Sequence, residues 1–285
     1  MMLSKHRLSI FPALLLCVLI GGCRLDAQPT RLELHDLTTG RTLAGARILQ
    51  SLRGVRLILM GEHHTSMSHH ADQLRVIRFL DEQRIPIVIG LEMFRQNQQE
   101  ALDRWVAGEI DEVDFEPIFL NNWNFPWKLY RDIFLYAREK KTPMVGLNVS
   151  GDITRRVASR GFASLSEEQR GELEGVTCNV TREYRDYIRS AFSAHDHSGM
   201  NFTHFCEAQL VWDAAMALHA VRYLENHPDR VMVLLAGSAH ARKMGIPFQV
   251  RSRRPIPLAV LLPYTPKIFD PDTVTTAEAD FLIMP

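Results

Sequence analysis

Short, compact runs of apolar residues alternate along this chain with longer stretches in which apolar residues recur at helical spacing. The compact runs are short enough for buried strands and cover residues 56–60, 86–93, 143–148, 230–236 and 257–262. The stretches with helical spacing cover residues 68–83, 96–107, 128–140 and 204–226. Strands separated by helices are typical of α/β proteins, so we predict a mostly parallel central sheet with helices on both faces.

Weaker patterns complete the predicted domain. Residues 31–37 alternate apolar and polar and predict a strand, residues 43–52 have helical spacing, and residues 279–284 predict a last, edge strand. The stretch of about 151–203 lacks strong strand patterns, and its helical pieces centre on Arg155, Glu168 and Arg185. We therefore expect one α/β domain over residues 31–285 that carries a helical insertion.

The first 22 residues have the pattern of an export signal. Lys5 and Arg7 precede a 13-residue, mostly apolar segment, which is shorter than the roughly 20 residues that a membrane-spanning helix needs. The segment ends in Leu-Ile-Gly-Gly followed by Cys23, which resembles the cleavage site of bacterial lipoproteins. We predict a signal peptide over 1–22, lipidation of Cys23 and a tether over 23–30. A plain signal peptide or a short anchor with an incidental cysteine is the alternative.

Several observations bear on where the chain acts and what it binds. Residue 24 is Arg and not Asp, which favours the outer membrane over the inner membrane for a lipoprotein. The 285 residues contain 33 Lys+Arg and 33 Asp+Glu with 46% hydrophobic residues, so disorder is excluded and a general nucleic-acid binder is disfavoured. No glycine-rich dinucleotide or P-loop motif occurs. Cys178 and Cys206 predict either an envelope disulfide or two buried thiols.

Polar side chains gather at the ends of four predicted strands. The carboxyl ends of neighbouring parallel strands meet at one edge of a sheet, where open α/β sheets bind ligands. The residues expected to converge there are Glu62, His63, His64, Glu92, Asn148 and His240. Such a set can bind a divalent metal or act as general acid and base. A structural hydrogen-bond network is the alternative, but for the set as a whole we favour a functional cleft.

Two further groups of histidines are present. His69 and His70 begin a predicted helix, where solvated helix-start residues are favoured over a metal or haem contact. His195 and His197 lie in the insertion near Tyr184 and Tyr187. An iron-porphyrin site needs an axial Tyr or His and an apolar wall, which this region could supply. A polar loop beside a packed helix is the equal alternative.

The motifs together resemble those of the ChaN-like haem-binding lipoproteins, within the wider Tiki, TraB and erythromycin-esterase superfamily. The resemblance spans about residues 31–285. It rests on an ordered series: Gly61-Glu62-His63-His64, Gly90-Leu91-Glu92-Met93-Phe94, Trp123 to Trp127, Leu147-Asn148, Ala208-Gln209, Trp212-Asp213, Met216-Ala217 and Ala236-Gly237-Ser238-Ala239-His240.

The resemblance implies an envelope lipoprotein that binds haem and takes part in haem or iron acquisition or storage. It also implies a homodimer around stacked haems with a tyrosine iron ligand, for which Tyr184 and Tyr187 are the first candidates and Tyr130 the next. In the wider superfamily the proposed metal or catalytic set corresponds to His63, Glu92 and His240. We favour a carrier or store, working with an outer-membrane haem uptake system, over the alternative of a metal-dependent hydrolase or peptidase.

Overall fold

The computed structural model describes residues 29–173, 175–193 and 201–285. The strands are β1 (Glu33–Asp36), β2 (Arg41–Ala44), β3 (Leu57–Glu62), β4 (Ile87–Arg95), β5 (Met144–Asn148), β6 (Val231–Gly237), β7 (Leu258–Pro263) and β8 (Phe281–Ile283). The helices are α1 (Ala46–Ser51), α2 (Met67–Glu82), α3 (Gln99–Ala107), α4 (Glu112–Asn122), α5 (Arg131–Lys140), α6 (Gly151–Arg160), α7 (Glu167–Glu172), α8 (Arg182–Ser193), α9 (Phe202–Asn226), α10 (Ser238–Ala241) and α11 (Ile246–Arg253). Short 3-10 helices are η1 (Gln96–Gln98), η2 (Trp127–Leu129) and η3 (Phe162–Ser164).

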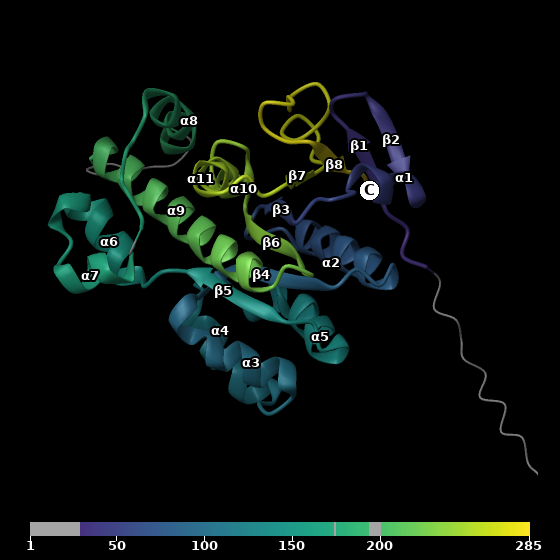
Figure 1. Cartoon of the computed structure of the whole chain (residues 1–285), viewed down its shortest axis with the longest axis horizontal. Coiled ribbons are helices and arrows are strands. Elements are labelled where there is room, and N and C mark those ends of the chain that lie inside the picture. Colours follow the sequence, from purple (N-terminus) through teal and green to yellow (C-terminus); the bar gives the residue numbers. More distant parts are fainter. Residues whose placement is uncertain (1–28, 174, 194–200) are drawn as a thin grey trace, which may run out of the picture.

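All eight described strands form one sheet in the order β2-β1-β8-β7-β3-β6-β4-β5. Neighbouring strands from β8 to β5 pair in parallel, whereas β1 pairs antiparallel with both β8 and β2. Figure 1 shows the sheet between two layers of helices, with α6, α7 and α8 at the end of the molecule away from β1 and β2. The α/β fold with a mostly parallel sheet is therefore confirmed.

Alternation along the strands divides the core between the two faces of the sheet. On β3, Ile58 and Met60 pack with the apolar residues of α2 to α5, while Leu57 and Leu59 pack with those of α9 and α11. Side chains of successive strand residues point to opposite faces, so a strand that is apolar throughout can bury both of its sides. The apolar runs of the sequence thus account for the central strands.

Several elements differ from the sequence prediction. Residues 43–52 were predicted as one helix, but β2 ends at Ala44, and Gly45 with a φ of 53° makes a turn before α1. The predicted C-terminal strand is present as β8, but its predicted edge position is wrong, because β8 lies between β1 and β7 and leaves β2 and β5 at the sheet edges. Helices α4 and α11 were missed because their apolar residues do not form one clear stripe.

The arrangement of the parallel strands determines where polar strand ends meet. In the central part of the sheet, β3, β6, β4 and β5 are consecutive neighbours, so their carboxyl ends share one edge. No helix among the described residues has both the length and the apolar content required to cross a bilayer. Cys23 and the predicted signal peptide lie outside the described residues.

Candidate functional site

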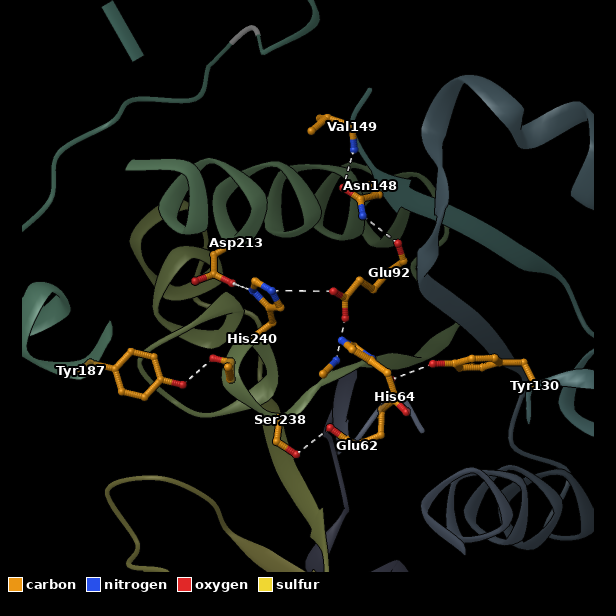
Figure 2. A network of polar contacts seen from close by, with 12 residues as sticks. Glu62, His64, Glu92, Tyr130, Asn148, Val149, Tyr187, Asp213, Ser238 and His240 are labelled. Carbon is orange, nitrogen blue, oxygen red and sulfur yellow. Dashed lines mark hydrogen bonds and ion pairs between the residues drawn. The ribbon is translucent and has the colours of Figure 1, made fainter. Parts of the chain in front are cut away.

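Three strand ends bring a polar cluster together at one edge of the sheet. Glu62 ends β3, Glu92 lies in β4, and the chain after β6 turns directly into the short helix α10 with His240. Figure 2 shows His64 and His240 beside the carboxylate of Glu92, with Glu62 close to His64. The predicted convergence therefore occurs for Glu62, His64, Glu92 and His240.

Glu62 is the most strongly hydrogen-bonded carboxylate of the cluster. Its Oε1 accepts from Tyr130 Oη at 3.0 Å and lies 2.5 Å from His64 Nδ1, and its Oε2 accepts from His70 Nε2. Burial alone raises the pKa of this carboxyl, but the hydrogen bonds from His64 and His70 outweigh burial and bring the pKa down to about 2. Glu62 is thus ionised at neutral pH, and all three neighbours act as donors.

His64 is the exposed member of the cluster, with 30% of its side chain accessible. Its ring lies 5.0 Å from those of Trp123 and Phe125, centroid to centroid. Burial lowers the pKa of His64. The hydrogen bond with Glu62 and the charge of Glu92 raise it by more, so the pKa is above the ordinary value. Because Nδ1 donates to Glu62, Nε2 is the nitrogen that can exchange a proton with a ligand.

His63 does not join the cluster, which corrects the assignment that the resemblance implied. Its side chain is exposed and its Nδ1 lies 3.2 Å from Thr65 Oγ1. Residues 63 and 64 follow the end of β3, where a change of direction exchanges which side chain points inward. The structure therefore places His64, and not His63, beside Glu92 and His240.

Glu92 is held by the last residue of β6. Its Oε2 accepts the backbone N–H of Gly237 at 2.6 Å, and its Oε1 is 3.7 Å from His240 Nε2. A Cβ at Gly237 would stand 2.8 Å from Cε1 of His64. Glycine is therefore required here so that the backbone can approach both His64 and Glu92.

His240 is hydrogen-bonded to a second carboxylate, that of Asp213, which the strand-end pattern did not predict. Its Nδ1 is 2.7 Å from Oδ1 of Asp213, and Oδ2 of Asp213 accepts from Tyr184 Oη at 2.7 Å. Burial lowers the pKa of His240, but the charges of Glu92 and Asp213 reverse this and raise the pKa to about 9. Burial raises the pKa of Asp213. An aspartate within the apolar pattern of the helix over 204–226 was the available signal.

Asn148 and Ser238 position the backbone around the cluster. Asn148 Nδ2 donates to the carbonyl of Glu92 at 2.8 Å, and its Oδ1 accepts from the N–H of Val149. Ser238 Oγ donates to the carbonyl of Glu62 at 3.1 Å. Asn148 thus lies at the predicted strand end, with its amide directed to backbone and not to the side chains of the cluster.

His69 and His70 are buried, so the prediction of solvated helix-start residues is wrong. His69 Nδ1 accepts the N–H of His63 at 3.0 Å, its Nε2 lies 3.1 Å from Thr265 Oγ1, and burial lowers its pKa. His70 packs against Tyr130, with 4.1 Å between ring centroids, and donates to Glu62. Both histidines belong to the hydrogen-bonded support of the strand end.

The three candidate tyrosines occupy different environments. Tyr130 and Tyr184 are fully buried and donate to Glu62 and Asp213, and burial raises the pKa of both. Tyr187 is only half-buried, its hydroxyl donates to the carbonyl of Ala239, and burial raises its pKa as well. Of the three, Tyr187 is therefore the phenol nearest to the surface.

The two cysteines do not join the cluster. Cys178 and Cys206 are free thiols, so of the two alternatives the disulfide is not formed. His195 and His197 lie outside the described residues. Within the described part of the chain, no three His, Cys, Asp or Glu side chains are arranged to hold a metal ion. The predicted metal alternative is therefore unsupported by the geometry.

The chemistry that the cluster can perform is proton transfer. The imidazole of His64 is bonded to Glu62, and that of His240 is bonded to Asp213. Both rings face a third carboxylate, that of Glu92, as Figure 2 shows. A carboxylate behind a histidine fixes its tautomer and orientation, as in general acid–base sites. The same bonds also join β3, β4, β6 and α9, so the cluster stabilises the fold at this edge.

The model of one protein family matches residues 48–250, and its description is haem-binding uptake, Tiki superfamily, ChaN. The chain belongs to this ChaN family. The resemblance seen in the motifs is thereby confirmed, and the match supports a function related to haem binding and uptake.

Two solved structures are similar to this ChaN-family chain, and the first of them has the same fold. A structure of ChaN from Campylobacter jejuni with cofacial haem has a TM-score of 0.66 and 20% identity, and covers 89% of this chain and 96% of that one. A mutant erythromycin esterase in its open conformation has a TM-score of 0.48 and 14% identity, and covers 83% of this chain and 77% of that one. No curated protein sequence matches the chain significantly.

Proposed function

We propose that this ChaN-family protein is a lipid-anchored, haem-binding protein of the cell envelope that takes part in haem or iron acquisition or storage. The family membership carries haem binding, and the sequence around Cys23 supports the anchor. The outer membrane, a homodimer around haem and cooperation with a haem uptake system are parts of the same proposal.

Of the three candidate tyrosines, Tyr187 has the surroundings that fit haem best, on the surface formed by α8 and the start of α9. Tyr187 supplies a phenol, and Phe202 and Phe205 pack around the same apolar cluster. Arg185 and Arg189 lie over the ring of Phe202, with 5.9 Å and 4.8 Å to its centroid. We name this surface, made of these five residues, the α8–α9 face.

The donor types of the α8–α9 face match the parts of a haem group. Bound haem supplies a ferric iron, which takes a tyrosine phenolate as axial ligand, and an apolar ring with two carboxylates. The phenylalanines offer an apolar wall, and guanidinium groups pair with carboxylates. Because Tyr187 has a raised pKa, loss of its proton accompanies ligation and makes binding weaker in acid.

A haemin titration of the purified protein tests this proposal. The expected result is a saturable Soret band, with a tyrosinate charge-transfer band that Tyr187→Phe removes together with about tenfold or more of affinity. Tyr223→Phe, on α9 beside His227 and outside the α8–α9 face, is the matched control and should bind as the unaltered chain does. A spectrum that is unchanged by Tyr187→Phe would reject this residue as the ligand.

Two more measurements address the anchor and the dimer. Cys23→Ser should release the protein from the membrane fraction and abolish incorporation of labelled fatty acid. Sizing with and without haemin should show a larger species only with haemin. A protein that stays monomeric when haem is bound contradicts the dimer alone and leaves haem binding intact.

A second candidate function is general acid–base hydrolysis without a metal. The observation that favours it is the pair of imidazoles, His64 and His240, that both face Glu92. Turnover in an ester and peptide screen should be lost in His240→Ala and His64→Ala but kept in His63→Ala, the exposed neighbour. Equal activity in all of these variants would reject the hydrolase.

A further inference from the structure

A separate pocket lies between helices α2 and α5, on the other side of His70 from the cluster. Its volume is about 380 Å³, which falls within the range of small-molecule sites. Leu74, Leu129 and Ile133 form an apolar part of its wall, and Arg31, Arg75 and Arg78 form a basic part. We name it the α2–α5 pocket.

The basic wall of the α2–α5 pocket favours an anion. Three arginines line it against a single acidic residue, Asp132, whose side chain is 71% exposed. Arg31 pairs with Glu33 and Arg75 with Asp72, while Arg78 lies over the ring of Tyr136 at 5.3 Å. Burial raises the pKa of Asp72 to about 6. As the pH falls towards this value, Asp72 loses negative charge and neutralises the charge of Arg75 only in part.

Two buried polar atoms of the wall have no hydrogen-bond partner among the described residues. They are Nδ1 of His70, whose side chain is 3% exposed, and Nε of Arg75. A buried polar group without a partner costs about 1–3 kcal/mol. Both side chains line the pocket, so an occupant that reached these atoms after a small side-chain shift would remove that cost. The pocket thus combines charge, apolar wall and unpaired polar atoms.

His70 connects the α2–α5 pocket to the polar cluster. Its Nε2 donates to Oε2 of Glu62, and Oε1 of the same carboxylate is bonded to His64. A group bound at Nδ1 of His70 is therefore one imidazole ring away from Glu62.

We propose that the α2–α5 pocket is a second binding site, distinct from the α8–α9 face, for an amphipathic monocarboxylate. The carboxylate accepts from Nε of Arg75 and lies against the ring of His70, and the apolar body packs on Leu74, Leu129 and Ile133. A ligand in the pocket changes the environment of His70, and the hydrogen bonds from His70 to Glu62 and from Glu62 to His64 carry this change to the cluster.

Calorimetric titration of the haem-free protein with octanoate and octan-1-ol tests the proposal. Octanoate should bind saturably at one site, and octan-1-ol at least tenfold more weakly because it lacks the charge. Ala71→Trp places a large ring in the pocket from an exposed position of α2 and should abolish octanoate binding. Ala46→Trp, the same change at an exposed position of α1, is the matched control and should bind as before. Thermal unfolding of both variants verifies that they fold.

Several outcomes would overturn the proposal. They are the absence of saturable octanoate binding, equal binding of octanoate and octan-1-ol, and octanoate binding that survives Ala71→Trp. Octanoate binding that haemin displaces would place the ligand on the α8–α9 face instead. Histidine ring NMR tests the link: the signals of His70 and His64 should both shift at saturation, and unmoved signals would refute the link through His70.

Discussion

Nδ1 of His240 lies 2.7 Å from Oδ1 of Asp213, although the first follows strand β6 and the second lies inside helix α9. Both side chains are almost completely buried, and Glu92 stands 3.7 Å from the other ring nitrogen of His240. The imidazolium is therefore held between two carboxylates, which explains why its pKa is raised although burial alone would lower it.

Replacing Asp213 tests this relationship. Asp213→Asn keeps the size of the side chain but removes its charge, so the pKa of His240 should fall from about 9 by about one unit or more, with Glu92 preserving part of the shift. NMR titration of the His240 ring in both proteins measures the change. Asp186→Asn, an exposed position on α8, should leave the His240 titration where it is. An unchanged midpoint in Asp213→Asn would contradict the role of Asp213.

The raised pKa of His240 also predicts how stability depends on alkaline pH. A histidine whose pKa is higher in the folded than in the unfolded state stabilises the fold fully below about 6.5, and this contribution is lost as the pH rises through about 9. The shift corresponds to at most about 3 kcal/mol. Denaturant titrations between pH 6 and 10 should show the decline, and His240→Gln should flatten it.

Much of this site follows from the sequence, and the remainder depends on side-chain direction. Parallel strands place their ends at one edge, so the convergence of Glu62, Glu92 and His240 was predictable. That His64 and not His63 joins the cluster was not predictable, because it depends on how the chain turns after β3. Asp213 was missed because it reaches the cluster from a helix and not from a strand end.

The hydrogen-bond donors to Glu62 could not be predicted from the sequence for a related reason. His70 and Tyr130 come from α2 and from the end of η2, and only packing brings them to the end of β3. Polar residues at the start of a helix are usually solvated, so local pattern alone assigned His69 and His70 to water. A buried ionised carboxylate needs several donors, and that requirement was the physical reason for their burial.

Removing the charge of Glu62 should destabilise the protein. Glu62→Gln leaves an amide among three donors, and breaking a buried ionic network costs about 3–5 kcal/mol. Chemical denaturation at pH 7 measures the loss. Glu116→Gln, at an exposed position of α4, is the matched control and should change stability by no more than about 0.5 kcal/mol. Similar unfolding midpoints for the two variants would contradict the network.

Glu62 should also govern stability in acid. A carboxyl whose pKa is lower in the folded than in the unfolded state stabilises above about 4.5, and this contribution is lost as the pH falls through about 2. Unaltered protein should lose up to about 3 kcal/mol over that window. Glu62→Gln should show a shallower acid dependence, since the titrating group is absent.

Tyr184 is expected to stabilise the fold and not to bind haem. Tyr184→Phe removes the hydroxyl that donates to Asp213 and leaves a buried carboxylate oxygen without that donor, which should cost about 1–3 kcal/mol. Its haemin titration should match that of the unaltered chain. A lost Soret band in a folded Tyr184→Phe protein would transfer the ligand role from Tyr187 to Tyr184.

Gly237 and Gly171 give opposite expectations for the same substitution. Gly237→Ala puts a Cβ 2.8 Å from Cε1 of His64 and 3.7 Å from Oε2 of Glu92, so the ring or the backbone must shift, at a cost of about 1–3 kcal/mol. At Gly171, inside α7, nothing lies within 4 Å of the new Cβ, and Ala should stabilise the helix by about 0.5–1 kcal/mol. Thermal unfolding should show a lower unfolding temperature for Gly237→Ala and a higher one for Gly171→Ala than for the unaltered protein. The NMR signal of the His64 ring should move only in Gly237→Ala. Equal unfolding temperatures for the two variants would show that the end of β6 is not held against His64 as the structure describes.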